Sequence, residues 1–366
     1  MPFTSLGNFQ KLPTRMNIFH IPNNHGGFSS SLATGERALG FETTVISGAN
    51  PYSAAPDIEL PSVGEAGAVK ARLKTFFNVR RAADIIHFNS GSSLFNPPFR
   101  NKFLLDLPFY RSKTHKIMTF QGSDIRVEYA DVMEESRQCE MELGYKLNDN
   151  TAGGIIPQDE ILRKKALSRK TAKYADKIFT LNPDLLKSLP ASAEFLPYPY
   201  FVGEPHTPSI QDVSRPLRIA HLATNRVLKG TGLIEAQLSN LAKWHDIEYR
   251  VIVRQPREIA IDAIQWADIL IDQVCLGWYG AQAVEALALG KPVLCFLNPQ
   301  DRQKFLPKGN TGIINCQHHE IAETLAEFCE DRMRVEHYGT AGMAFVKNFH
   351  DSKKVAHQVY RKWSDT

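Results

Sequence analysis

The sequence predicts an α/β protein of two Rossmann-like domains, each built on a parallel sheet. Short apolar runs alternate with stretches of helical periodicity, an order that produces parallel strands joined by right-handed crossovers. The alternation stops between residues 197 and 216, where five prolines occur with little periodicity, and then resumes. A length of 366 residues suits two domains of ordinary size, so this proline-rich stretch is predicted to link them.

In the first half, apolar runs that end in polar or glycine-bearing loops are predicted to be strands. They cover residues 16–20, 43–47, 83–88, 116–120 and 177–181. The first run leads into the loop sequence IPNNHGG. Residues 28–39 follow this loop and are predicted to form a helix that ends at Gly40.

The second half repeats the same alternation. Strands are predicted at residues 217–222, 249–253, 269–271, 293–296 and 312–314, and helices at 232–244, 281–289, 319–330 and 333–349. Open α/β sheets bind ligands at the carboxyl ends of their strands, so we expect a cleft between the two domains. This architecture fits an enzyme, a periplasmic-type binding protein or a kinase equally well.

Composition excludes several classes of protein. A formal net charge of +4 is too small for a typical nucleic-acid binder. The five cysteines form no CxxC pair and the twelve histidines are scattered, so we predict no metal site and a reducing, cytoplasmic environment. No run approaches about 18 apolar residues, and the N-terminal residues lack the pattern of a signal peptide, so no membrane span is expected.

The first candidate site is the segment TNRVLKGT at residues 224–231, between a predicted strand and a predicted helix. Arg226 and Lys229 are three residues apart, so both can face one side of the turn. Gly230 permits close backbone approach, and the N-terminus of the next helix favours anions. The turn therefore suits a diphosphate, and a solvated loop with incidental cations is an equally open alternative.

The second candidate site begins where a buried strand ends at Asp272. A Gly-Trp-Tyr-Gly loop follows at 277–280, and Glu285 then lies in an otherwise apolar helix. The loop glycines leave backbone amides accessible at a helix N-terminus, which favours an anion. A carboxylate in such a helix is costly to bury without a partner. The hydroxyls of a ribose are one suitable partner, and a neighbouring cation is the other.

These segments resemble the GT-B glycosyltransferases, and among them the retaining family-4 type. TNRVLKGT is similar to that family's donor-diphosphate motif, and GWYGAQAVEALALGKPV is similar to its Glu-x7-Glu loop and helix. IPNNHGGFSSSLATGERALGFETTVIS, TFQGSDIR and YADKIFTLNPDLLKSLP agree more loosely. The resemblance implies an acceptor domain over residues 1–205, a donor domain over 206–348, and a C-terminal helix over 349–366 that crosses back to the first domain.

The resemblance also implies roles for individual residues. Arg226 and Lys229, in the turn with Asn225 and Gly230, should hold the donor diphosphate. Glu285 matches the second Glu of the motif and should bind the ribose. Two pairs of residues should approach the donor closely: Tyr279 and Gly280 beside the diphosphate and sugar, and Gly26 and Gly27 in the glycine-rich loop that approaches donor phosphate and acceptor.

Two positions depart from the family pattern. The first Glu of Glu-x7-Glu falls on Gly277, and Asp272 is a candidate to supply a carboxylate in its place. Gln121 stands where the family often has His. A glutamine can hydrogen-bond a sugar but cannot relay a proton near neutral pH.

The implied activity is transfer of a sugar, with retention, from a nucleoside-diphosphate sugar to an acceptor hydroxyl. The cations and the helix N-terminus would stabilise the leaving diphosphate, so no metal ion or cofactor is expected. The acceptor would be a saccharide or lipid-linked molecule in polysaccharide or glycolipid synthesis. Two alternatives remain: a non-hydrolysing sugar-nucleotide epimerase, for which Asp124 and His87 are the only hints, and a catalytically silent sugar-nucleotide-binding protein, which Gly277 favours.

Three further features have two interpretations each. Residues 66–81 predict a basic amphipathic helix that either contacts anionic lipid at the inner face of the membrane or buries one face and solvates its charges. His20 and His87 lie at strand ends and either face the cleft or are satisfied interior histidines.

Overall fold

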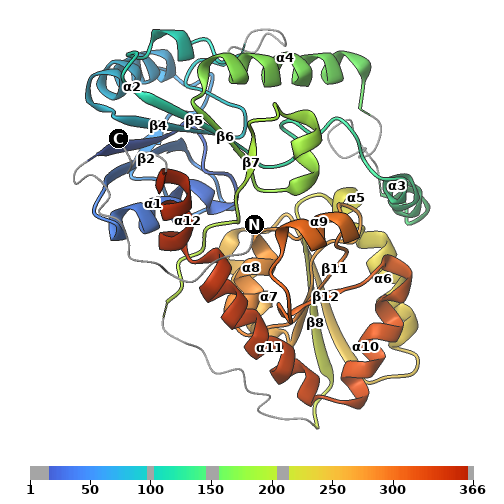
Figure 1. Ribbon diagram of the computed structural model, residues 1–366. Coiled ribbons are helices and arrows are strands. Elements are labelled where there is room, and N and C mark those ends of the chain that lie inside the picture. The colour runs from blue at the N-terminus through green and yellow to red at the C-terminus, as the bar shows by residue number, and fades with distance from the viewer. Residues whose placement is uncertain (1–15, 97–102, 146–155, 204–213, 362–366) are drawn as a thin grey trace. The chain divides into compact units, whose positions relative to one another are not determined.

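The computed structural model describes residues 16–96, 103–145, 156–203 and 214–361, which form two compact units (Figure 1). Unit 1 comprises Met1–Val127, Pro157–Phe201 and Phe349–Thr366, and unit 2 comprises Glu128–Ile156 and Val202–Asn348. Glu128–Ile156 thus belongs to unit 2 although it interrupts unit 1 along the chain, and a linear division at residue 205 does not separate it. None of the described helices is both long and apolar enough to cross a bilayer.

Unit 1 is built on a parallel sheet in the order β3-β2-β1-β4-β5-β6-β7. The five strands expected from the apolar runs are confirmed, and two very short strands, β3 and β7, extend the sheet at its edges. The strands are β1 (Asn17–Ile21), β2 (Glu42–Gly48), β3 (Ile58–Leu60), β4 (Ile85–Asn89), β5 (His115–Phe120), β6 (Lys177–Thr180) and β7 (Glu194–Phe195).

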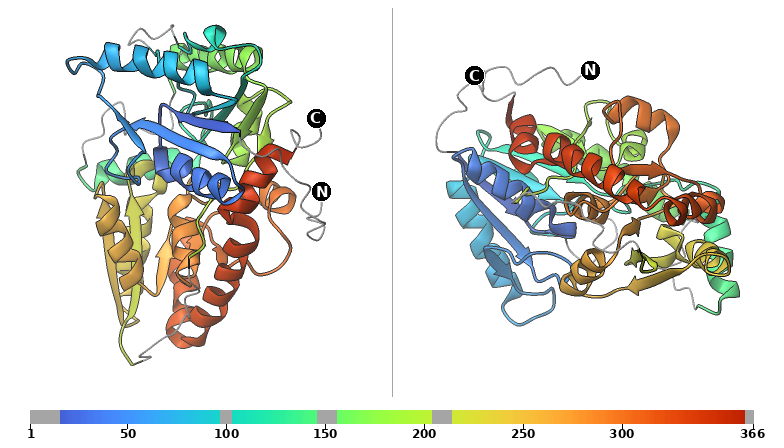
Figure 2. Two further views of the ribbon diagram at one scale, coloured as in Figure 1. Left: turned by 90° about the vertical axis from the view of Figure 1, so that its left-hand side faces the viewer. Right: turned by 90° about the horizontal axis from the view of Figure 1, so that it is seen from below.

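Helices cover both faces of the unit 1 sheet (Figures 1 and 2). Successive side chains of each strand point to opposite faces, so each face packs its own apolar side chains against helices. Ile85 packs with α1 (Phe28–Ala38) and α12 (Ser352–Tyr360). Its neighbour Ile86 packs with α2 (Ala68–Ala82) and α4 (Gln158–Tyr174). Both faces are therefore apolar, and the strands appear in the sequence as continuous apolar runs.

Unit 2 has a parallel sheet in the order β12-β11-β10-β8-β9, and all five expected strands are confirmed. They are β8 (Leu217–Ala223), β9 (Ile247–Val253), β10 (Ile269–Ile271), β11 (Val293–Cys295) and β12 (Ile313–Asn315). The helices are α3 (Val132–Glu142), α5 (Arg226–Lys229), α6 (Thr231–Leu241), α7 (Arg257–Trp266), α8 (Ala281–Ala288), α9 (Pro299–Phe305), α10 (Ile321–Glu330) and α11 (Met333–Phe345).

The strand order determines where each unit can bind a ligand. In a doubly wound sheet the crevice lies beyond the carboxyl ends of the two strands at which the order reverses. Those strands are β1 and β4 in unit 1, and β8 and β10 in unit 2. The TNRVLKGT turn directly follows β8, and Asp272 directly follows β10, so both unit 2 motifs lie at its reversal point.

Candidate functional site

The turn after β8 is a tightly packed structure. The Asn225 side chain caps α5 by accepting a hydrogen bond from the Leu228 N–H at 3.1 Å. Gly230 ends α5 with φ of +75°, and a Cβ there would lie only 2.5 Å from the Val274 side chain. A glycine is thus required both by conformation and by the close approach of the loop after β10. The contact brings Lys229 to the end of β10.

Lys229, Asp272 and Gly280 form a cluster that joins the two motifs. The buried Asp272 carboxylate pairs with the Lys229 ammonium through one oxygen. Its other oxygen accepts a hydrogen bond of 2.6 Å from the Gly280 N–H, at the N-terminus of α8. Asp272 therefore occupies the position that an anionic ligand would take between a lysine and a helix N-terminus.

His221 on β8 connects the end of β10 to the start of α6, and this role was not identified from the sequence. Its Nδ1 lies 2.9 Å from the Ile271 carbonyl, which can only accept, so Nδ1 carries the proton. Nε2 then accepts from the Thr231 hydroxyl at 2.9 Å. Burial lowers the pKa of His221 to about 4, so the ring is neutral near pH 7. The signal was a histidine inside the apolar run RIAHLA.

Arg226 lies on the same turn but has different partners. Its Nε donates to Glu140 of α3 at 2.6 Å, another nitrogen pairs with Glu235 of α6, and the guanidinium lies 3.9 Å from the centre of the Tyr145 ring. Burial lowers the pKa of Arg226, but the hydrogen bonds to the two glutamates outweigh it and raise that pKa. The side chain is only 12% exposed, so the turn is not a solvated loop.

Glu140 also reaches the backbone of the turn. Its second oxygen accepts a hydrogen bond of 2.6 Å from the Gly232 N–H, in the first turn of α6. Glu140 is thus a second internal anion at a helix N-terminus, like Asp272 at α8. Two cations, Arg226 and Lys229, face three carboxylates, so the cluster has an excess of negative charge.

Glu285 is paired with Arg257, which begins α7. Burial raises the pKa of Glu285, and the Arg257 guanidinium opposes this shift. The sequence left a ribose and a neighbouring cation open as partners of Glu285, and in the structure the cation Arg257 is paired with it. Arg257 is 37% exposed, so it can turn into solvent and release the carboxylate.

The loop before α8 presents backbone rather than side chains. Tyr279 is fully buried and stacks on Trp278 at 5.0 Å between ring centres. Gly277 has φ of +73°, a left-handed conformation that side chains rarely adopt. This conformation gives a physical reason for the missing first Glu of the motif: a glutamate at Gly277 would be strained.

In unit 1, Gln121 lies where three strands end. Its amide donates to the Asn89 side chain at 2.9 Å and to the His25 carbonyl at 3.3 Å. The half-buried Asp124 carboxylate accepts the Gln121 N–H at 2.9 Å and the Gly122 N–H at 2.7 Å, and so fixes the loop after β5. Burial raises the pKa of Asp124, and these backbone hydrogen bonds oppose the shift.

The glycine-rich loop after β1 turns directly into α1. Gly26 and Gly27 have φ of +57° and +70°, and the Gly27 N–H donates to Ser53 at 3.1 Å. A Cβ at Gly27 would meet no described atom within 4 Å. The glycine is required by conformation there, and the space beside it remains open to a ligand.

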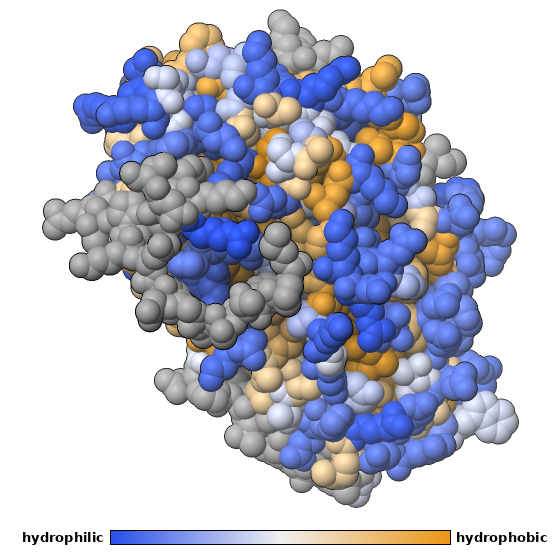
Figure 3. All heavy atoms as spheres, viewed as in Figure 1, coloured by the Kyte–Doolittle hydropathy of each residue, from blue (hydrophilic) through white to orange (hydrophobic). Residues whose placement is uncertain are grey.

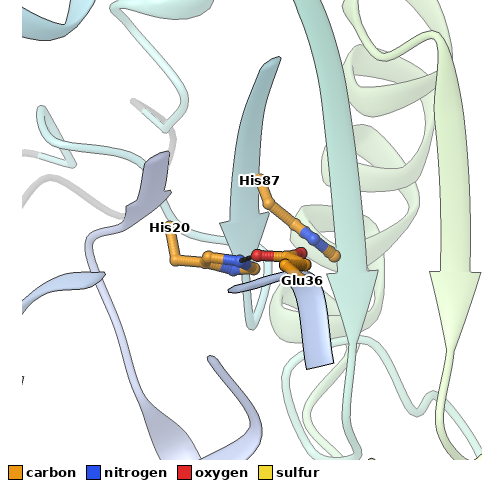
Figure 4. Close-up of side chains that lie close together, drawn as sticks. All are labelled: His20, Glu36 and His87. Atoms are coloured by element: carbon orange, nitrogen blue, oxygen red, sulfur yellow. Dashed lines mark hydrogen bonds and ion pairs between the residues drawn. The ribbon is translucent and has the colours of Figure 1, made fainter. Parts of the chain in front are cut away.

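His20 and His87 are interior histidines on neighbouring strands, paired in register (Figure 4). Glu36 of α1 accepts from His20 Nε2 at 2.8 Å and from the Tyr360 hydroxyl of α12. Within the described parts of the chain these three residues are the group that could hold a metal ion, with ligand atoms within 4.8 Å of one another. Both oxygens of Glu36 already have partners, so the group connects α12 to α1 and β1.

Comparison with known proteins establishes the fold. No family model and no curated protein sequence matches the chain. Sucrose-phosphate synthase from Thermosynechococcus elongatus superposes with a TM-score of 0.59 and 12% identity, covering 96% of this chain and 99% of that one. Anabaena HepE in complex with UDP-glucose gives 0.57 and 11%, covering 96% and 100%. A glycosyltransferase from Rickettsia africae gives 0.56 and 10%, covering 96% and 98%. The chain has the GT-B fold of these glycosyltransferases.

Proposed function

We propose that the chain is a glycosyltransferase that moves a sugar from a nucleoside-diphosphate sugar to an acceptor hydroxyl. The observation that carries the proposal is the cluster of Lys229, Asp272 and the Gly280 N–H at the β8/β10 reversal point of unit 2. The GT-B fold supports this reaction class, and the UDP-glucose bound by HepE supports the donor class.

In the proposed complex the donor diphosphate takes over the hydrogen bonds and ion pairs that the protein's own carboxylates make in the structure. Phosphate oxygens take up the hydrogen bonds that Lys229 and the Gly280 N–H now make to Asp272, beside the turn of Asn225 and Gly230. Arg226 turns from its glutamates to the second phosphate. The exchange leaves three carboxylates without their cationic partners, so these side chains must turn away from the phosphates, because like charges at close range would repel the diphosphate.

The ribose is proposed to take the place of Arg257 on Glu285, with its hydroxyls as donors to the carboxylate. The backbone of Tyr279 passes beside the diphosphate, because the buried ring of that residue keeps the loop in position. By the family resemblance, Gly26 and Gly27 of the loop after β1 are proposed as residues that bind donor phosphate and acceptor.

Catalysis would come from electrostatic stabilisation of the departing diphosphate. Lys229, Arg226 and the helix N-termini oppose the charge that develops there, in the role that a metal ion has in other enzymes. An oxocarbenium-like sugar forms, and the acceptor attacks with retention while a donor phosphate oxygen takes its proton. Gln121 orients the sugar by hydrogen bonding, and no titrating base, metal ion or cofactor is needed.

The biological setting is proposed by resemblance to the retaining family-4 type. The acceptor is a saccharide or lipid-linked molecule in polysaccharide or glycolipid synthesis. The reaction takes place in the cytoplasm, and with a lipid-linked acceptor it takes place at the inner face of the membrane.

The test is release of nucleotide from a panel of UDP- and GDP-sugars. Wild type should release nucleotide slowly without acceptor, and Lys229→Gln, which can still hydrogen-bond Asp272, should lower turnover by about 100-fold. Lys243→Ala, at an exposed position after α6, is the matched control. Conversion of the sugar without nucleotide release would indicate an epimerase, and binding without turnover would indicate a silent binder; either would replace the proposal.

A further inference from the structure

Helix α2 presents apolar side chains on two different faces. Ala68, Phe76 and Val79 are buried against the sheet of unit 1. Val69, Leu73 and Phe77 follow one another at intervals of four residues and so share another face of the helix. These three side chains are 69%, 43% and 62% exposed. A surface helix needs only one apolar stripe to reach its core, so the second stripe requires another explanation.

The exposed stripe lies among basic side chains. Lys70, Lys74, Arg80 and Arg81 are all exposed, and residues 66–83 contain no acidic residue. Arg80 donates to the Phe109 carbonyl at 2.8 Å, which places the 65% exposed Phe109 beside the C-terminal end of the helix. We call the three stripe residues, Phe109 and the four basic residues the α2 face.

The figures show the position of this surface within unit 1. Helix α2 lies against one face of the unit 1 sheet, and the opposite side of the helix is directed away from that sheet (Figures 1 and 2). On the side of the molecule seen in Figure 3, hydrophobic residues are interspersed among hydrophilic ones. The apolar residues form a line along one side of the helix, and the charged residues of that helix are all basic, a combination that suits the boundary between headgroups and acyl chains of an anionic bilayer.

We propose that the α2 face docks on a bilayer that contains anionic lipid. Its apolar side chains would enter the boundary between headgroups and acyl chains, and its basic side chains would contact lipid phosphates. The proposal extends the proposed function by naming the surface that would bring the protein to a lipid-linked acceptor. Vesicle binding needs no turnover, so this proposal and glycosyl transfer can fail independently.

The experiment is co-sedimentation of the full chain with vesicles of phosphatidylcholine, with or without phosphatidylglycerol. We expect at least about tenfold tighter binding to the vesicles with phosphatidylglycerol, and weaker binding at high salt. The triple variant Val69→Ser, Leu73→Ser and Phe77→Ser should lose about tenfold in binding. Its substitutions are on the exposed face, and circular dichroism would verify the fold.

A matched control is Leu162→Ser on α4, where an exposed leucine precedes the basic Arg163 in the same unit. This variant should bind vesicles like wild type. Equal binding of wild type and the triple variant, or no preference for anionic lipid, would overturn the proposal. Binding to an acidic protein without any binding to vesicles would overturn it as well.

Discussion

Replacement of Glu140 by Gln tests whether the chain's own carboxylate competes with the donor. Glu140 contacts both Arg226 Nε and the Gly232 N–H at 2.6 Å. Glutamine has nearly the same shape, and its single carbonyl oxygen can still accept the Gly232 hydrogen bond. Its amide nitrogen then faces Arg226 Nε, so Arg226 loses that hydrogen bond and keeps Glu235 as its counter-ion. The substitution therefore removes one negative charge from the cluster with little change in packing.

The expected effect follows from the distance between the charges. When Arg226 turns to a phosphate, the displaced Glu140 carboxylate would remain roughly 6 Å from that phosphate. Two unit charges at that distance repel by about 3 kcal/mol at an effective dielectric constant of about 20. Screening by solvent and salt reduces the repulsion to about 1.4 kcal/mol, which corresponds to a tenfold change in affinity.

The assay is isothermal titration with inorganic pyrophosphate and with UDP and GDP. Glu140→Gln should bind the diphosphate of the donor nucleotide, and pyrophosphate, about tenfold more tightly than wild type. Glu142→Gln, at an exposed position on the same helix, should bind like wild type. If Glu140→Gln is folded, by thermal melting, and its affinities equal those of wild type, Glu140 does not compete for the site.

Three further predictions follow from other parts of the structure. His221 has a lowered pKa of about 4, so protonation favours the unfolded chain, and this group should lower stability by up to roughly 3 kcal/mol between about pH 6.5 and pH 4. His221→Gln should reduce the pH dependence of urea-unfolding midpoints over that window by this amount, and the contribution of His350, whose pKa is also lowered to about 4, should remain. Gly277→Glu should restore the family motif yet lower stability by about 1–2 kcal/mol because of its left-handed backbone; unchanged stability would contradict the strain argument. Treatment with a chelator should leave nucleotide release unchanged, since Lys229 and Arg226 supply the positive charge; loss of activity that Zn²⁺ restores would instead direct attention to His20, Glu36 and His87.

Much of the fold was accessible from the sequence because strand and helix signals are local. Apolar runs such as RIAHLA predicted all five strands of unit 2. Strands β3 and β7 were missed because their sequences, IEL and EF, contain a glutamate and no run of apolar residues. Helix α3 was not assigned to unit 2, because its docking on Arg226 depends on contacts nearly ninety residues apart in the chain.

The sequence by itself determined which residues stand at the carboxyl ends of strands in the second sheet, since a turn directly after a strand must lie at that end. The strand order, and with it the reversal point, came from the tertiary structure. Only the tertiary structure decided the partners of these residues: Lys229 with Asp272, Arg226 with Glu140, and Glu285 with Arg257. The reason is physical. Periodicity and turn chemistry act between near neighbours along the chain, whereas a buried charge pairs with whichever opposite charge the packed sheets and helices bring within a few ångströms.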